Sequence, residues 1–139
     1  MLFEESTCYK KLNPHKLQMP FGNFYLCDNF LVSELNEGIH FDWEMVNTVM
    51  IKVIDHYGKD VQLGYISNRV NSYSMDPQTW DLVDRVYNRV LQTGAIVYYN
   101  KMMSINASLE KRFTPIKIKR CRTLKEAIEW TLSKQEPKA

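Results

Sequence analysis

The first third of the chain has hydrophobic positions spaced as in β-strands. We predict strands over residues 2–10, 23–27 and 30–35, with the pair Asp28-Asn29 as a tight turn between the last two. Strands joined by so short a connection pair antiparallel. An antiparallel meander is therefore expected to open the fold.

The pattern becomes helical at Asp42. Hydrophobic side chains from Trp43 to Tyr57 recur every three or four residues, so they share one face of a helix. Asp42 has the side chain of a helix N-cap, and Gly58 lies where a helix commonly ends. The sequence thus predicts a helix between these two residues.

A second helix is predicted to follow the polar segment after residue 67. Asp76 precedes Pro77, an order that is favoured at helix N-termini. Gly94 is expected to end this helix. Its apolar stripe comprises Trp80, Val83, Tyr87, Val90 and Leu91.

Strands and helices alternate through the rest of the chain. The remaining predicted elements are strands over 61–67, 95–99 and 116–119, the last at a sheet edge, and helices over 104–112 and 123–133. Thr123 and Glu126 have the spacing of a capping box. Such alternation indicates parallel strands joined by right-handed crossovers. We therefore expect one α/β domain over residues 1–139 with a small mixed β-sheet, and a C-terminal tail that frays from about residue 134.

Length and composition exclude several classes of protein. A chain of 139 residues buries roughly 68–70% of its unfolded surface, so it needs no metal or disulfide to stabilise a core. Its 24% charged residues and formal net charge of +2 are ordinary for a globular protein. Disordered chains and strongly basic nucleic-acid-binding proteins differ from it in both respects. We therefore expect no nucleic-acid partner.

The cysteines and the first residues bear on localisation. Cys8, Cys27 and Cys121 are far apart and outside any C-x-x-C spacing, which favours reduced thiols. The N-terminal segment contains Glu4 and Glu5 and lacks the apolar run of a signal peptide. Charged or amide residues interrupt every hydrophobic stretch, so no transmembrane segment is expected. The sequence therefore predicts a cytoplasmic protein.

Two segments and the order of the elements resemble a known fold family. The helix after Asp42, the strand LGYIS, the loop NRVNSYS and the helix after Asp76 resemble the SpoIIAA-like fold shared by the STAS domains of anti-sigma-factor antagonists. More narrowly, FGNFYLCDNFLVSELNEGIHFDWE and YISNRVNSYSMDPQTW look like an uncharacterised bacterial subgroup with a loose likeness to STAS and CRAL-TRIO lipid-binding domains. The resemblance covers residues 20–133 and implies a fold rather than an activity.

The STAS resemblance also implies where a phosphorylation motif would lie. Phosphorylatable STAS proteins have an Asp-Ser-Ser-Gly type motif at the start of the second helix. This chain has Ser74-Met75-Asp76-Pro77 there, and Ser72 does not match the motif either. Because Asp76 already places a charge at the expected helix cap, we do not expect the usual phosphoserine switch.

Polar residues follow several of the predicted strands. Ligands of open α/β sheets bind outside the carboxyl ends of the strands, so these residues could form a pocket or a docking surface. Arg69 and Lys101 would receive an anionic or carbonyl group there. The alternative is that these asparagines are ordinary turn residues and the cations are solvated. The candidate surface comprises Asn36, Asn68, Arg69, Asn71, Ser72, Tyr73, Ser74, Asn100 and Lys101.

Residues 67–74 form a polar loop longer than a minimal strand-to-helix connection. Tyrosine and arginine are enriched at interaction hot spots, so Arg69 and Tyr73 indicate contact with a partner protein. Alternatively, the loop forms internal hydrogen bonds and covers the sheet edge.

Motifs for catalysis, nucleotide binding and metal binding are missing from the sequence. The five glycines fit neither G-x-G-x-x-G nor G-x-x-x-x-G-K-[ST], and His15, His40 and His56 are scattered. Asp42 and Asp76 would repel a phosphate from the N-termini of the first two helices. We therefore expect no enzyme activity, no cofactor and no metal.

Charge is distributed unevenly along the chain. Residues 28–60 contain seven acidic and two basic residues, whereas residues 111–125 contain seven basic residues and no acid. The basic segment could attract an acidic partner, an anionic membrane surface, or the acidic region of a second copy in a dimer. It could equally protect an edge strand from aggregation.

Two functions remain open at this point. The preferred one is a non-enzymatic regulatory module that works through protein–protein contacts, using residues 68–74 and the basic strand near Lys117. The alternative is a small-ligand or lipid-binding protein with a pocket at the carboxyl ends of the strands. That pocket would be lined by Tyr65, Trp80, Tyr98 and Tyr99. Plain core packing would also explain these four aromatic residues.

Overall fold

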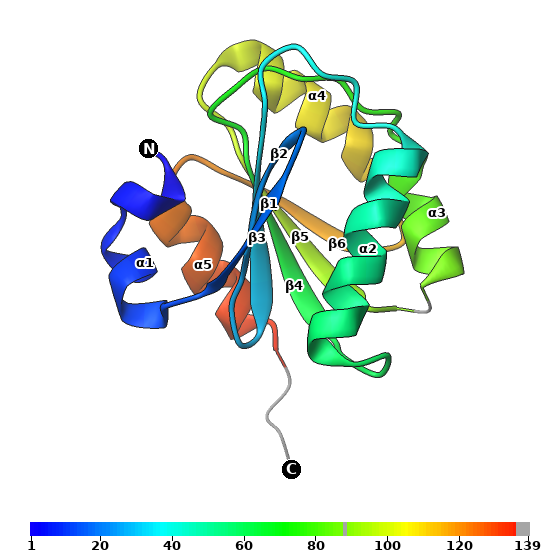
Figure 1. Ribbon diagram of the computed structural model, residues 1–139. Helices are drawn as coiled ribbons and strands as arrows, with labels where there is room; N and C mark the ends of the chain where they lie inside the picture. Colours follow the sequence, from blue (N-terminus) through cyan, green and yellow to red (C-terminus); the bar gives the residue numbers. More distant parts are fainter. Residues whose placement is uncertain (88, 136–139) are drawn as a thin grey trace.

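Figure 1 shows a computed structural model of the protein, which describes residues 1–87 and 89–135. Its centre is a six-stranded sheet in the order β1-β2-β3-β4-β5-β6. The strands are β1 (His15–Met19), β2 (Gly22–Leu26), β3 (Phe30–Leu35), β4 (Leu63–Asn68), β5 (Leu91–Val97) and β6 (Lys117–Cys121). The helices are η1 (Phe3–Glu5), α1 (Thr7–Leu12), α2 (Trp43–Tyr57), α3 (Thr79–Val86), α4 (Lys101–Lys111) and α5 (Leu124–Ser133).

The sheet is mixed, as predicted. Strands β1, β2 and β3 pair antiparallel, and β3, β4, β5 and β6 pair parallel. Helices α1 and α5 lie on one face, and α2 and α3 lie on the other (Figure 1). Helix α4 lies toward the end of the sheet at which β3, β4 and β5 finish.

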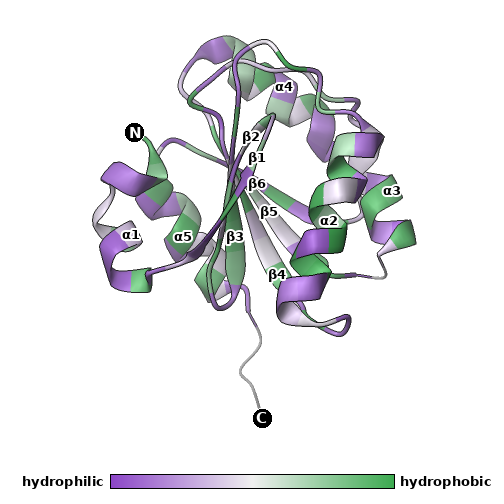
Figure 2. Ribbon diagram, viewed as in Figure 1, coloured by the Kyte–Doolittle hydropathy of each residue, from purple (hydrophilic) through white to green (hydrophobic). Residues whose placement is uncertain are grey.

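Strands β2 to β6 contribute to two hydrophobic cores because successive side chains point to opposite faces, whereas edge strand β1 packs Leu17 and Met19 against one core. Leu31 and Ile96 face α2, where Val53 is fully buried. Val32 and Ile66 lie on the opposite face and pack in the core beneath α5. The central strands are accordingly coloured as mainly hydrophobic in Figure 2.

The predicted ends of the first and last long helices are confirmed. Asp42 Oδ1 accepts a hydrogen bond from the backbone N–H of Met45, which caps α2. Gly58 ends α2 with φ +100°. Thr123 Oγ1 accepts from Glu126 N at the start of α5, while the Glu126 carboxylate accepts from Arg122 N.

The predicted strand over residues 2–10 is wrong. Those residues form η1 and most of α1, and Ser6 begins α1 by accepting a hydrogen bond from the backbone N–H of Tyr9. Phe3 is fully buried and meets Tyr25 edge-on at 5.1 Å. Strand β1, which sequence reasoning missed, begins at His15 and lies at the sheet edge, where exposure permits polar residues.

The predicted bounds of the second helix are also wrong. Helix α3 begins at Thr79, and Asp76 instead accepts a hydrogen bond from Gln78 N in the preceding turn. Leu91 and Gly94 belong to β5 rather than to the end of a helix. A Cβ at Gly94 would lie 2.9 Å from the Trp80 ring, so this glycine serves close packing of α3 on the sheet.

The other predicted elements are present with shifted bounds. The largest shift is in β5, which spans 91–97 where we predicted 95–99. Helix α4 starts three residues before the predicted 104–112. Of the tail predicted to fray from about residue 134, residues 136–139 lie outside the described part of the chain.

Candidate functional site

The segment 69–77, here called the 69–77 loop, follows β4 and is held against the residues before α2. Gly38 donates its backbone N–H to Ser72 O at 2.7 Å, and Ser74 donates to Ile39 O at 2.9 Å. These bonds fix the loop across the carboxyl end of the sheet, near α4 (Figure 1).

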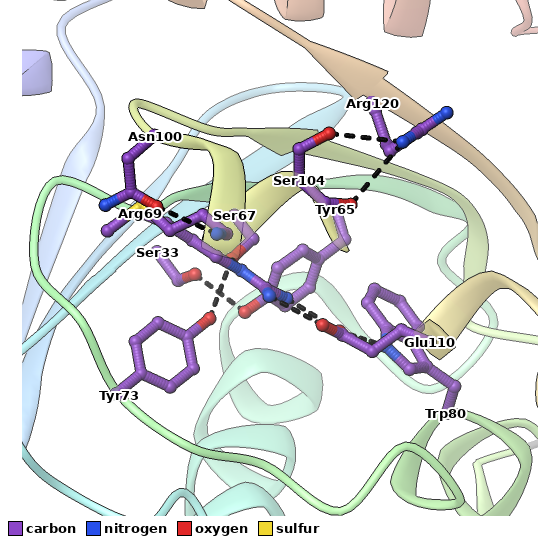
Figure 3. A network of polar contacts seen from close by, with 11 residues as sticks. Ser33, Tyr65, Ser67, Arg69, Tyr73, Trp80, Asn100, Ser104, Glu110 and Arg120 are labelled. Carbon is purple, nitrogen blue, oxygen red and sulfur yellow. Dashed lines mark hydrogen bonds and ion pairs between the residues drawn. The ribbon is translucent and has the colours of Figure 1, made fainter. Parts of the chain in front are cut away.

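Arg69 begins this loop, and its guanidinium is buried. Its Nη1 and Nη2 donate to the two carboxylate oxygens of Glu110 on α4 at 2.5 and 2.6 Å. Its Nε donates to Ser67 Oγ, and Trp80 Nε1 donates to the same Glu110 carboxylate at 2.8 Å (Figure 3). Arg69 and Glu110 are 7% and 3% exposed. Arg69 is therefore engaged within the protein and links β4 to α4.

Tyr73 lies on the other side of the Arg69 guanidinium (Figure 3). The guanidinium carbon is 5.2 Å from the centre of the ring, a cation–π distance, and Tyr73 Oη is 2.9 Å from Ser67 Oγ. Burial raises the pKa of Tyr73, which the charge of Arg69 partly offsets. The phenol therefore stays protonated at neutral pH and contributes hydrogen bonding and packing rather than proton abstraction.

Tyr65 extends the polar network to β3. Its hydroxyl lies 2.6 Å from Ser33 Oγ, and its ring meets Trp80 edge-on at 5.5 Å. Burial raises the pKa of Tyr65. The polar groups from Ser33 to Glu110 thus satisfy one another beneath the 69–77 loop.

An open pocket of about 230 Å³ lies between the 69–77 loop and α4 and is here called the loop–α4 pocket. Three candidate residues predicted from the sequence line it, together with Met75 and Pro77 of the loop and three residues of α4 that sequence reasoning missed. The first three are Arg69, Tyr73 and Ser74, and those of α4 are Asn106, Leu109 and Glu110.

Ser74 and His40 form a surface pair that the sequence did not suggest. Ser74 Oγ is 2.8 Å from His40 Nδ1, and both residues are exposed. Within the described part of the chain, no hydrogen-bond partner orients the other ring nitrogen of His40. The pair thus lacks the third group of a catalytic triad and is best explained as one more tie between the loop and residues 38–41.

Asn68 lies on the opposite face of the sheet from Arg69. Its Nδ2 donates to Glu34 Oε2 at 2.6 Å, and its Oδ1 accepts from the Tyr99 hydroxyl at 2.7 Å. The Glu34 carboxylate also accepts from Phe3 N at 2.7 Å. Burial raises the pKa of Glu34, which these two hydrogen bonds partly offset.

The other candidate residues are dispersed. Asn36 and Asn71 donate hydrogen bonds to the backbone oxygens of Pro20 and Leu35, as turn residues do. Ser72 is exposed in the loop. Asn100 caps α4 by accepting from Met103 N at 2.9 Å, and Lys101 is exposed on the first turn. The predicted surface is therefore divided between the two faces of the sheet. Of its residues, Arg69, Tyr73 and Ser74 meet at the loop–α4 pocket.

Helix α4 also presents a row of exposed apolar side chains, which we call the α4 stripe. These four residues lie three or four positions apart and follow one side of the helix and the turn after it. Their spacing is visible in the sequence, but our prediction began the helix at residue 104. The stripe comprises Met102, Ile105, Leu109 and Phe113, which are 64%, 47%, 44% and 45% exposed.

The aromatic residues of the ligand-binding hypothesis do not line one pocket. Tyr65 and Trp80 pack together in the core, where they border an apolar cavity of about 40 Å³. Tyr98 accepts a hydrogen bond from Arg122 Nε at 3.2 Å, and Tyr99 reaches Asn68 on the other side of the sheet.

Among the residues that the structure describes, no group of three or more His, Cys, Asp or Glu side chains is arranged to hold a metal ion. In residues 1–87 and 89–135, no helix has the length and apolar character needed to cross a membrane.

Burial raises the pKa of Cys27 to about 12 and that of Cys121 to about 11, so both thiols are protonated at neutral pH.

Comparison with known proteins bears on the fold. No protein-family model matches this sequence, and no curated protein matches it either. Among solved structures, the chain is similar to an uncharacterised protein of the DUF3478 family from Shewanella loihica PV-4, which is described as having a SpoIIAA-like fold. The two share 10% sequence identity with a TM-score of 0.54, over 85% of this chain and 91% of that one. Together with the mixed sheet and its helices, this similarity shows that the protein has a SpoIIAA-like fold.

Proposed function

We propose that this protein is a non-enzymatic regulatory module that acts by binding another protein. Its docking surface consists of the loop–α4 pocket and the α4 stripe. The observation that carries the proposal is the exposure of four large apolar side chains in one row beside an open pocket.

The exposed stripe is a source of binding free energy. Covering apolar surface contributes about 25 cal/mol per Å² removed from water. Single exposed apolar residues are common, whereas contiguous ones beside a pocket are typical of interaction sites. A partner that covers Ile105 and Leu109 would gain this contribution without rearranging the core.

The internal pairing of the polar groups supports a role without catalysis. Arg69 and Glu110 bind each other, and Ser67 contacts both Arg69 and Tyr73. A catalytic site instead holds groups with unsatisfied capacity toward a substrate. Three free cysteines support the further proposal that the module acts in the cytoplasm.

Site-specific photocrosslinking tests this function. A photoreactive phenylalanine analogue replaces Asn106 in the pocket or, as control, exposed Lys52 on α2, and each protein is irradiated in extract of its source cells. We expect a discrete protein adduct from position 106 that Leu109→Glu abolishes and Ile51→Glu leaves intact. Adducts that are equal at both positions, or that ignore Leu109→Glu, would count against the proposal.

A second candidate function is binding of a small ligand or lipid. Its support is the same pocket of about 230 Å³ at the carboxyl end of the sheet, which combines apolar walls with polar groups. Native mass spectrometry of the purified protein tests it, because a bound ligand adds a fixed mass that Leu109→Glu should remove.

A further inference from the structure

The α4 stripe has the geometry of a surface that receives a helix. Met102, Ile105 and Leu109 lie along one side of α4 over about 10 Å or two turns, and Phe113 continues the row in the turn after the helix. Partner helices bind grooves through apolar side chains at the same spacing of three and four residues. The stripe therefore matches the apolar face of one short helix.

One flank of the stripe is hollow. Leu109 belongs to both the stripe and the loop–α4 pocket, and Met75 and Pro77 form apolar walls of the pocket across from it. A lipid surface has no side chain with which to fill such a hollow, whereas a helix can project one. Large apolar anchors in pockets dominate many protein interfaces. The hollow beside the stripe therefore favours a protein over a membrane as the binding partner.

The other flank of the stripe is basic. Lys101 and Arg112 are exposed, and the helical repeat places both beside Ile105, on the side of the stripe away from Asn106 and Glu110. Glu110 is the one acidic residue of α4, and it is buried with its charge balanced by Arg69. No acidic side chain on the surface of α4, all of which is described, offsets these cations. Complementary charge would steer an acidic partner to this flank.

We propose that the α4 stripe binds an acidic amphipathic helix of another protein. One large apolar side chain of that helix enters the loop–α4 pocket, and its carboxylates face Lys101 and Arg112. This inference rests on the proposed function and specifies the chemistry of the partner.

A selection experiment with the full chain tests the inference. A displayed library of helical peptides about 18 residues long, or five turns, keeps apolar residues on one face and varies every other position among Glu, Lys, Ser and Ala. Peptides are selected on the wild-type protein and depleted on Ile105→Ser/Leu109→Ser, which removes the apolar side chains without adding charge. We expect the enriched peptides to be acidic. Fluorescence anisotropy should give a Kd at least about ten-fold weaker for Ile105→Glu and for Lys101→Glu/Arg112→Glu, which corresponds to about 1.4 kcal/mol.

Matched substitutions on α2 control for folding and total charge. Ile51 is 57% exposed, so Ile51→Glu repeats the change from an apolar to an acidic residue. Lys52→Glu/Lys59→Glu, at two exposed positions in α2 and just after it, repeats the reversal of two charges. Both should leave the Kd unchanged, and circular dichroism should show that every variant is folded.

Three results would overturn the inference. They are enrichment of neutral or basic peptides, absence of peptides that distinguish the stripe variant from wild type, and stripe-dependent binding to phosphatidylglycerol vesicles in place of peptides. If the crosslink from position 106 persists while the peptides are not acidic, the proposed function stands and only the partner's chemistry is wrong. If the crosslink is absent while acidic peptides bind, the peptide chemistry stands and the cellular function is wrong.

Discussion

Arg69 and Glu110 form a buried bidentate ion pair that joins the end of β4 to α4 across 41 positions of sequence. Trp80 donates a third hydrogen bond to the same carboxylate, so α3 is included in the connection. The pair lies under the loop–α4 pocket and sets the position of α4 relative to the 69–77 loop. It therefore contributes to the shape of the loop–α4 pocket, which both residues line.

Removing one member of this pair should destabilise the protein strongly. Glu110→Ala leaves the Arg69 charge buried without a partner, and we expect a loss of about 3–5 kcal/mol in the free energy of unfolding. Arg69→Met/Glu110→Leu should lose less than Glu110→Ala, since no buried charge remains. Urea denaturation measures both, with exposed Lys111→Ala as the control. A loss below about 1 kcal/mol for Glu110→Ala would contradict this account.

Glu34 should make stability depend on pH. Its folded-state pKa is raised, chiefly by burial, so the folded state holds the proton more tightly than the unfolded state. The free energy of unfolding should therefore fall as pH rises from about 4.3, the unfolded pKa, to the folded pKa.

Glu34→Gln should abolish that fall while keeping an oxygen that can accept from Phe3 N and Asn68. Thermal denaturation between pH 4 and 7 is the measurement. Exposed Glu129→Gln should retain the wild-type profile. Identical pH profiles for wild type and Glu34→Gln would show that Glu34 is not the responsible group.

Gly64 should tolerate no larger residue. A Cβ at this position would lie 2.2 Å from Thr131 Cγ2 on α5. Gly64→Ala should destabilise the protein by about 1–3 kcal/mol, since α5 cannot move away without losing core contacts. Thr131→Ser removes the clashing methyl group, so the double variant should be more stable than Gly64→Ala alone in chemical denaturation. If the double variant instead loses the sum of the two single-variant losses in stability, a contact other than the Thr131 methyl group prevents a larger residue at position 64.

Asn100 should act as the cap of α4 rather than as a ligand-binding residue. Its side chain accepts from Met103 N, so Asn100→Ala should lower stability by about 1 kcal/mol. Asn100→Asp keeps the acceptor and should restore the wild-type melting temperature. Asn106→Ala, within the same helix, is the control and should not lower the melting temperature. Equal melting temperatures for Asn100→Ala and wild type would show that the Asn100 side chain does not stabilise α4 as a cap.

Local signals were sufficient to predict several elements. The helix from Trp43 to Tyr57 has a regular apolar face and a capping residue, and α5 has Thr123 and Glu126 at its start. Both helices follow from interactions within a few residues. The parallel order of β3 to β6 followed from strands that alternate with helices, because crossover connections constrain such a chain.

Other features depended on distant contacts. Residues 2–10 have an ambiguous local pattern, and burial of Phe3 against Tyr25 accompanies their helical conformation. Glycine is common at helix ends, so we predicted that Gly94 ends a helix. The structure places it in β5, where the close approach of the Trp80 ring explains why glycine is needed. The candidate site was predicted only in part, since its residues on α4 meet the 69–77 loop through tertiary packing.

The sequence by itself determined the mixed α/β class, the main helices and the polar loop after β4, because periodicity, caps and turn residues act over short distances. Only the tertiary structure decided that Arg69 is buried against Glu110, that Asn68 faces the opposite side of the sheet, and that the α4 stripe borders a pocket. Those outcomes depend on which elements pack against each other. Burial and ion pairing between residues far apart in sequence follow from that packing, and local patterns do not encode it.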